Sequence, residues 1–442
     1  VTVPQLTVGS DCVVSGNGTF EVDAMDVMPG GVISADGAGF GAGQGPGAAV
    51  TDNHAASHGG LGGNAELGAY GSAVFPETMG SGGAGGPGGG IIHITASTSL
   101  NVDGTVSANA PAGALYYGAG AGGSVTVSTG IFSGSGVISA NGGEGTCPGC
   151  DTMKSSGGGG GRIAVYYQTF SFTGAVSAWG GIGANAPNGT PGTVGFFDES
   201  APGQLTLITG PTWRFESADS GYSLYDVFIQ NSTVEVSPDL LSLDIVHSLT
   251  LGSSGGVKAS TLFYADNSDH SLAINVPELS VMADALLVGN VQCYVDTMTV
   301  DLNGHVSADG TGYPVSQGPG ASSVEAHGAS HGGLGGWADL GTYGSPTAPT
   351  EWGSGGTGGV GGGAIYILAN TLLKVDGIVS ADAPTGLDRF GGGAGGSVYL
   401  VAGTFTGGGT VSANGGSTIC NCSTPFTCGG GGGRVAIESP NN

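Results

Sequence analysis

Basic residues are scarce in this chain. Only 7 of its 442 residues are lysine or arginine, against 33 aspartates and glutamates, and the formal net charge is −26. A surface of this charge repels phosphate backbones, which excludes nucleic acid as a partner. The acidic residues are scattered and indicate a solvated surface; loose calcium binding is the alternative, and no other cofactor is indicated.

Long hydrophobic runs are also missing. No stretch of about 18 consecutive apolar residues occurs, so the sequence predicts no membrane insertion. It has no initiator methionine and no signal peptide, and it opens within a pattern, because VTVPQLTV at 1–8 returns as INVPELSV at 274–281. We therefore expect the chain to be a processed or excised piece of a longer protein.

Cysteine is limited to seven residues, most of them in two short loops, CPGC and CNCSTPFTC. The disulfide candidates are the loop cysteines Cys147, Cys150, Cys420, Cys422 and Cys428. Two isolated residues, Cys12 and Cys293, are candidates for free or intermolecular thiols. The N-x-S/T motifs give four N-glycosylation candidates, Asn17, Asn188, Asn231 and Asn421. Together these features predict an extracellular or cell-surface location.

Glycine, by contrast, contributes 95 of the 442 residues. Each interior glycine costs a helix about 1 kcal/mol relative to alanine, which excludes a mainly helical protein. The apolar residues form short, β-branched runs between the glycines, and such runs favour strands.

A long segment of the chain is written twice. Most of 31–109 returns at 304–382 with a fixed offset of 273 residues and no gap. We therefore expect a Gly-rich β-solenoid repeat at 1–169 and its second copy at 274–442. The all-β connecting segment at 170–273 appears once, and we expect it to continue the solenoid.

A shorter phrase, [VI]-S-A-x, recurs within both copies. Its serines are Ser34, Ser107, Ser139, Ser177, Ser307, Ser380 and Ser412. Steps of 73 and 32 residues separate the phrases in each copy, and alternating apolar residues precede them. This pattern predicts an all-β parallel β-helix in which each phrase stacks on the next. Tandem β-sandwich domains are the alternative; they explain the alternation but not the returning phrase.

The insertion at 38–90 and its copy at 311–363 contain GGAGGPGGG and GGTGGVGGG. Two glycines followed by one variable residue give a period of three, which is typical of polyproline II. We expect long, ordered, polyproline II-like segments on the solenoid flank. A flexible linker is the alternative, but the retained length and the matched Tyr70 and Tyr343 argue against it.

Each insertion contains ASHGGLGG, with one histidine in the motif and another four residues earlier. That spacing would suit a metal pair on a helix, with Asp52 or Glu66 as a further ligand, but the flanking glycines disfavour a helix. We expect His58 and His331 to act as structural ties that hydrogen-bond backbone carbonyls of the loop.

Arg162 and Arg434 each follow a run of five glycines. An anion-binding loop would need a helix next, whereas the residues after each arginine alternate as a strand. We expect both guanidinium groups to hold carbonyls of the Gly-rich insertion in place, as structural ties.

No catalytic residues are predicted. Three lysines and four arginines offer a lyase few candidate bases, and no nucleophile elbow or P-loop occurs. Pairs such as Asp23 and Asp26, or Asp296 and Asp301, could serve a hydrolase, but short-range aspartate pairs are common in acidic proteins. We therefore expect a protein that is not an enzyme, with a β-helix polysaccharide lyase or hydrolase as the third hypothesis.

The combined string ASHGGxGG…YGS…GSGG…VDGxVSA…GGAGGSV…GGGGGR[IV]A resembles the Gly-rich β-repeat modules of large extracellular and surface proteins of protists. The resemblance covers most of 20–166 and 293–438. It implies a multi-repeat surface protein, mastigoneme-like or from another surface filament. We predict a structural subunit of an extracellular filament or coat that self-associates end to end; a carbohydrate-binding or adhesive module that contacts extracellular glycans is the alternative.

Overall fold

The structure is a computed structural model that describes residues 1–148, 154–200, 205–209, 212–215, 224–230, 232–237, 240–252, 261–264, 271–387, 390–418 and 428–440. The chain divides into two compact units, Val1–Tyr222 (unit 1) and Ser223–Asn442 (unit 2). Each unit is described by itself. Every regular element in the described residues is a strand, and none of them forms a helix.

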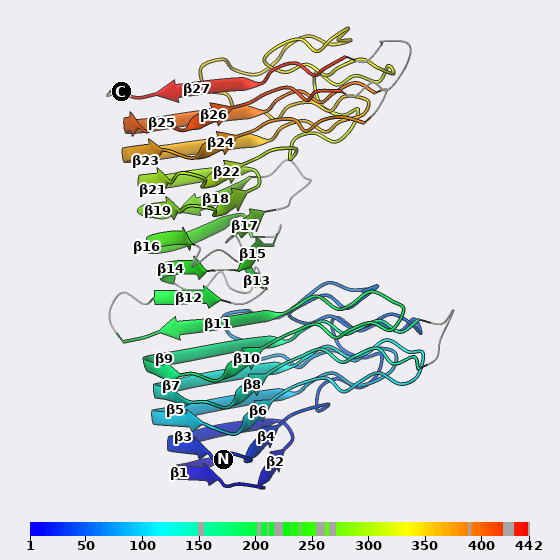
Figure 1. The fold of residues 1–442 in the computed structure, drawn as a ribbon, viewed down its shortest axis with the longest axis vertical. Coiled ribbons are helices and arrows are strands. Elements are labelled where there is room, and N and C mark those ends of the chain that lie inside the picture. Colours follow the sequence, from blue (N-terminus) through cyan, green and yellow to red (C-terminus); the bar gives the residue numbers. More distant parts are fainter. Residues whose placement is uncertain are drawn as a thin grey trace. The chain divides into compact units, whose positions relative to one another are not determined.

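Unit 1 contains one sheet of long strands, which form successive rows in Figure 1. They are β1 (Thr2–Val8), β3 (Gly18–Val27), β5 (Ile91–Val102), β7 (Ser124–Gly134), β9 (Arg162–Phe172), β11 (Thr193–Asp198) and β12 (Leu205–Thr209). From β1 to β11 each strand pairs in parallel with the next. β12 then pairs antiparallel with β11.

The second sheet of unit 1 is built from short parallel strands. They are β2 (Val13–Ser15), β4 (Val32–Ser34), β6 (Thr105–Ser107), β8 (Val137–Ser139) and β10 (Ala175–Ser177). A further strand, β13 (Thr212–Phe215), lies near the end of the unit. Aliphatic and aromatic residues of both sheets, such as Ile33, Leu100 and Phe132, share one buried cluster. Burial of these alternating side chains is the main force that holds the layers together.

Unit 2 repeats this plan. Its long strands are β14 (Leu224–Gln230), β16 (Ser242–Gly252), β18 (Leu272–Asn275), β19 (Glu278–Val281), β21 (Val291–Val300), β23 (Ala364–Val375), β25 (Ser397–Thr406) and β27 (Arg434–Glu438). β18 and β19 both lie between β16 and β21, and the pairs from β14 to β27 are parallel.

The short strands of unit 2 are also parallel. They are β15 (Thr233–Val236), β17 (Thr261–Tyr264), β20 (Leu286–Val288), β22 (His305–Ser307), β24 (Ile378–Ser380) and β26 (Thr410–Ser412).

The returning V-S-A phrase occupies the short strands of both units. In unit 1 the serines of β4, β6, β8 and β10 are register partners of one another, and in unit 2 those of β22, β24 and β26 are. Each phrase therefore marks one strand of the sheet, and the small serine side chains stack in a column.

The prediction of an all-β protein with parallel sheets is confirmed. The tandem β-sandwich alternative does not fit, because such sandwiches are built from antiparallel pairs, whereas each pairing given above is parallel except that of β11 with β12. The boundary between the units falls inside the predicted connecting segment, 170–273, and the described regular elements of that segment are strands.

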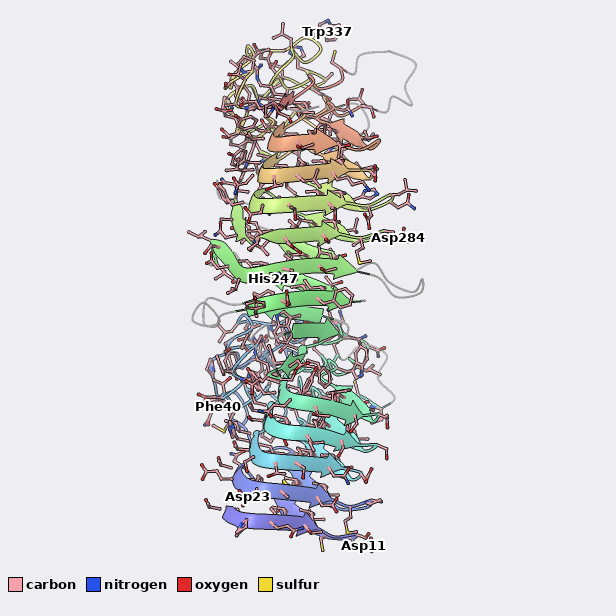
Figure 2. The ribbon with its side chains drawn as sticks, turned by 90° about the vertical axis from the view of Figure 1, so that its left-hand side faces the viewer. Asp11, Asp23, Phe40, His247, Asp284 and Trp337 are labelled. Carbon is pink, nitrogen blue, oxygen red and sulfur yellow. The ribbon has the colours of Figure 1, made fainter. Side chains whose placement is uncertain are left out.

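The two Gly-rich insertions repeat their backbone angles at the 273-residue offset. Gly45 and Gly318 both have φ of 102°, and Asn64 and Trp337 have φ of 52° and 50°. Asparagine adopts this left-handed region readily, but for a bulky residue such as Trp337 (Figure 2) it is unfavourable. The surrounding insertion therefore sets the backbone conformation at this position.

Candidate functional site

His58 is fully buried where the first insertion meets the loop before β7. Its Nδ1 lies 2.7 Å from the carbonyl oxygen of Gly122, and its Nε2 lies 2.9 Å from the hydroxyl of Thr78. Nδ1–H therefore donates to the carbonyl, and the Thr78 hydroxyl donates to Nε2. Burial, assisted by the charge of Arg162, lowers the pKa of His58 to about 3. The imidazole is thus neutral. Its hydrogen bond to a backbone carbonyl fits the expected structural tie.

Lowering the pH is expected to destabilise unit 1 through His58. Below about pH 6.5 the unfolded chain protonates this residue while the folded unit does not. The free energy of unfolding should therefore fall by up to about 1.4 kcal/mol per pH unit, until the pH approaches the folded-state pKa. Hydrogen exchange of unit 1 amides between pH 7 and pH 4 measures this slope.

The matched variant His58→Asn keeps a donor near Gly122 but removes the titration. Its stability should fall less steeply with acid than that of the wild type, and the difference isolates His58 from the many carboxylates. Parallel curves for the two proteins would contradict a buried, neutral His58.

His331 holds the equivalent place in unit 2, with one difference. Its Nδ1 lies 2.8 Å from the carbonyl oxygen of Gly395, the residue that matches Gly122. The position of Thr78 is taken by Glu351, and the buried Nε2 of His331 has no hydrogen-bond partner. Burial is again the main cause that lowers the pKa of this histidine. Unit 2 therefore keeps the carbonyl contact and loses the hydroxyl contact.

Arg162 and Arg434 both reach the carbonyl oxygen of the insertion tyrosine. Nε and Nη2 of Arg162, which is fully buried, lie 3.0 and 2.9 Å from the oxygen of Tyr70. Nε of Arg434, which is half-buried, lies 2.9 Å from the oxygen of Tyr343. Each guanidinium thus joins the first residue of a long strand to the insertion of its own unit.

The outer histidines of the insertions each contact a carboxylate. Nδ1 of His54 lies 3.3 Å from a carboxylate oxygen of Glu66, and Nδ1 of His327 lies 2.8 Å from one of Asp339. Because His58 is turned towards a carbonyl, the two histidines of the motif do not converge on one point. Among the described residues, no group of three or more potential metal ligands comes together.

A column of Asp and Asn side chains joins neighbouring layers, and sequence reasoning missed it. Each carboxylate or amide oxygen accepts a hydrogen bond from the backbone N–H at the same position of the next layer. The bonds are Asn109 to Asp36 (2.6 Å), Asn141 to Asn109 (2.7 Å), Trp179 to Asn141 (2.8 Å), Asp382 to Asp309 (2.6 Å) and Asn414 to Asp382 (2.5 Å). These Asp and Asn residues occupy the fourth position of the V-S-A-x phrase, and their recurrence there could have predicted the column.

Two of the four glycosylation candidates lie in the described residues, and both are exposed. The Asn17 amide donates to the carbonyl of Ala38 (3.0 Å) and accepts from the N–H of Ile91 (2.8 Å). Asn290, which has no such motif, makes the same two kinds of bond in unit 2. The oxygen of Asn188 accepts from Gly183. Asn231 and Asn421 lie outside the described residues, and glycosylation stays a prediction.

The cysteines differ in their surroundings. Cys12 is an exposed free thiol, whereas Cys293 is free but fully buried between Ile274 and Ile367 of the neighbouring strands. Burial raises the pKa of Cys293 to about 12. The prediction of a free thiol therefore holds for Cys293, and that of an intermolecular thiol is wrong, because its sulfur faces the core.

Cys428, predicted as a disulfide partner, carries a free thiol in this structure. Its sulfur packs against Gly336 of the second insertion, and partial burial raises the pKa of the thiol. The prediction that Cys428 forms a disulfide is therefore wrong. Cys150, Cys420 and Cys422 lie outside the described residues, so the pairing of Cys147 and of the second loop stays a prediction.

No family model matches the chain, and no curated protein or solved structure matches it. Nor is a helix that could cross a bilayer found in the part of the chain that the structure describes.

Proposed function

We propose that this chain is a non-enzymatic building block of an extracellular filament or surface coat. In this proposal each unit is a stretch of parallel β-helix that carries a polyproline II-like insertion, and copies join end to end through their edge strands. Edge strands with unpaired backbone groups are templates for pairing with another chain. The glycosylation motifs and loop cysteines support the extracellular setting.

The observation that carries the proposal is the exposure of core-type residues on the edge strands β1 and β27. Val3 of β1 is 38% exposed, whereas its counterpart Val276 in unit 2 is 2% exposed. Ile437 of β27 is 41% exposed, whereas its counterpart Val165 in β9 is fully buried. A side chain at the same inward-facing position is therefore buried when a further layer covers it.

The repeats also indicate which kind of strand would cover each edge. β19 and the last residue of β18, which match β1 in sequence, pair in parallel with β16 on their other side. β9, which matches β27, pairs in parallel with β11. Both edges thus have the form of a strand that accepts a parallel neighbour, and we propose that a further layer of the same kind, such as the edge of a second copy of the chain, supplies it.

Cys12 lies in the turn between β1 and β2, directly after Asp11, which Figure 2 labels. Its counterpart in unit 2 is Ala285, which is fully buried, while Cys12 is exposed. A side chain in this place would lie inside a joint between copies, where it would be buried as Ala285 is in unit 2.

The proposal predicts concentration-dependent linear assembly. Light scattering after size exclusion and negative-stain electron microscopy should show chains of end-to-end copies that lengthen as the protein concentration rises. Ile437→Lys places a charge on the β27 edge and should shift the population to monomer. Leu334→Lys, which adds the same charge at an exposed site of the second insertion, should assemble as the wild type does.

Two results would overturn the proposal. One is a wild-type protein that stays monomeric at every concentration, with and without reducing agent. The other is an Ile437→Lys protein that forms the same linear chains as the wild type.

A further inference from the structure

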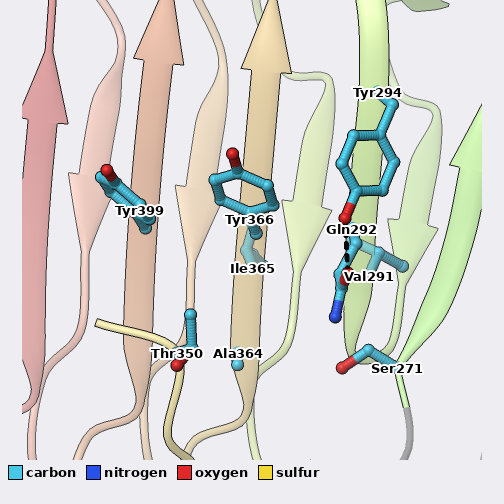
Figure 3. A pocket seen from close by; sticks show the side chains of 9 residues that line it. All are labelled: Ser271, Val291, Gln292, Tyr294, Thr350, Ala364, Ile365, Tyr366 and Tyr399. Atoms are coloured by element: carbon cyan, nitrogen blue, oxygen red, sulfur yellow. Dashed lines mark hydrogen bonds between the residues drawn. The ribbon is translucent and has the colours of Figure 1, made fainter. Parts of the chain in front are cut away.

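Unit 2 has a groove on the outer face of its long-strand sheet. It has a volume of about 240 Å³ and lies over β21, β23 and β25, with one wall from the second insertion (Figure 3). Its polar and aromatic lining consists of Ser271, Gln292, Tyr294, Thr350, Tyr366 and Tyr399. The groove lies on strands that are paired on both sides, so a ligand could reach it whether or not copies of the chain assemble as proposed.

Three tyrosines form the floor of the groove, one from each neighbouring strand. The ring centroids of Tyr294 and Tyr366 lie 5.8 Å apart, and those of Tyr366 and Tyr399 lie 5.2 Å apart. Figure 3 shows the rings in a row across the sheet, so that an extended ligand could contact all three. Tyr294 is 37% exposed, and the other two are half-buried.

The two outer hydroxyls of the row are held by hydrogen bonds. The Tyr294 hydroxyl donates to the side-chain oxygen of Gln292 at 2.8 Å, and the Tyr399 hydroxyl donates to Glu438 at 2.9 Å. These bonds orient the rings before any ligand arrives, which reduces the conformational entropy lost on binding.

Unit 1 lacks this aromatic row, although its backbone register is the same. Glu21, His93 and Thr126 occupy the positions of Tyr294, Tyr366 and Tyr399. Thr126 is buried, and its hydroxyl donates to the carbonyl of Pro76 in the first insertion at 2.9 Å. The three tyrosines are therefore a property of unit 2 and not a requirement of the fold.

The chemistry of the lining selects among ligands. Its side chains are tyrosine rings, small aliphatic groups, hydroxyls and one amide, and no lysine or arginine is among them. A phosphorylated or acidic ligand would find no counter-charge here, and the chain as a whole carries −26. Aromatic rings offer flat apolar surface, and the hydroxyls and the amide offer neutral hydrogen bonds.

From this combination we infer that the groove binds a neutral, extended oligosaccharide, whose apolar ring faces lie on the tyrosines and whose hydroxyls meet Gln292, Thr350 and Ser271. Tyrosine suits this role because it supplies rigid, amphipathic contact area with few rotatable bonds. Tyr366, at the centre of the row, should contribute most to affinity.

Titration calorimetry of the full chain with hexasaccharides tests the inference. The neutral probes are the hexamers of β-1,4-glucose, xylose, mannose and N-acetylglucosamine; the charged comparators are the glucosamine and galacturonate hexamers. At least one neutral probe should bind at concentrations up to about 5 mM, a range that detects weak sites. Tyr366→Ala should weaken that binding about tenfold or more, and Tyr366→Phe should retain it.

His93→Ala is the matched control, because it removes the side chain at the same register position of unit 1. It should leave the affinity unchanged. If Tyr366→Ala fails to fold, Tyr294→Ala takes its place, since that ring lies at the end of the row and is the most exposed of the three.

Four outcomes would overturn the inference. They are no binding of any neutral probe, binding of the charged probes alone, and an affinity that is the same in Tyr366→Ala as in the wild type. The fourth is loss of self-assembly in Tyr366→Ala without loss of oligosaccharide binding, which would assign the groove to a contact between copies.

Discussion

Replacing Gly118 with alanine is expected to lower the free energy of unfolding of unit 1 by about 3 kcal/mol, at the upper end of overpacking penalties. A Cβ built at Gly118 would overlap the backbone carbonyl of His54 in the first insertion. The Gly118 N–H also donates to the carbonyl of Asp52 at 2.7 Å. Because both neighbours are backbone, no side-chain rotation can make room, and the insertion must move away. Urea unfolding measures the loss.

Gly86→Ala, in the first insertion that Gly118 contacts, is the matched control. A Cβ there would have its nearest neighbour, the carbonyl oxygen of Ala112, at 4.0 Å. Its effect should stay within about 1 kcal/mol of the wild type, in either direction. Gly391, which matches Gly118 in unit 2, would overlap the carbonyl of His327, so Gly391→Ala should destabilise as Gly118→Ala does. Equal effects of Gly118→Ala and Gly86→Ala would contradict close backbone packing of the insertion.

The strands and their parallel stacking could be predicted from the sequence, because both depend on local pattern. The alternation of apolar residues defines each strand, and the returning V-S-A phrase marks the same strand in successive layers. Ser307, Ser380 and Ser412 are 73 and 32 residues apart, and they are register partners in the structure. A phrase that returns with the same sequence indicates stacking, because each of its residues pairs with the same residue of the next phrase.

The tyrosine row could not be found from the same spacing. Tyr366 and Tyr399 are 33 residues apart, but the phrases after them are 32 apart, because β23 has one extra residue after Ala369. A step of 32 would pair Tyr399 with the inward-facing Ile367. Since a slip of one residue moves a side chain to the other face of a strand, the bulge had to be known before the row could be recognised.

The hydrogen-bond partners of the histidines could not be predicted from the sequence for another reason. Sequence reasoning expected a backbone carbonyl as the partner of His58, but the carbonyl belongs to Gly122, 64 residues away. The replacement of Thr78 by Glu351 looks like an ordinary surface change until the structure places Thr78 at the Nε2 of His58 and leaves the buried Nε2 of His331 without a hydrogen-bond partner. Contacts of this kind depend on how an insertion returns to its sheet, which no local pattern reports.

Arg162→Met is expected to lower the free energy of unfolding of unit 1 by about 2–4 kcal/mol. The Tyr70 carbonyl would lose two charged donors in a buried place, and an unpaired buried acceptor is costly. Arg162→Lys should recover part of the loss, because an ammonium supplies charge but not two parallel N–H groups. Thermal unfolding and the hydrogen exchange of the amides around Tyr70 measure the effect.

Arg434→Met provides the comparison within the same molecule. Arg434 makes one bond to the Tyr343 carbonyl and is half-buried, so water can replace part of what is lost. Its effect on unit 2 should be about 1 kcal/mol. If the guanidinium groups merely fill space, methionine should serve equally well at both positions, and the two variants would be alike. A larger loss at Arg162, concentrated on the amides of the first insertion, is expected only if hydrogen bonds from this side chain hold the insertion against the sheet.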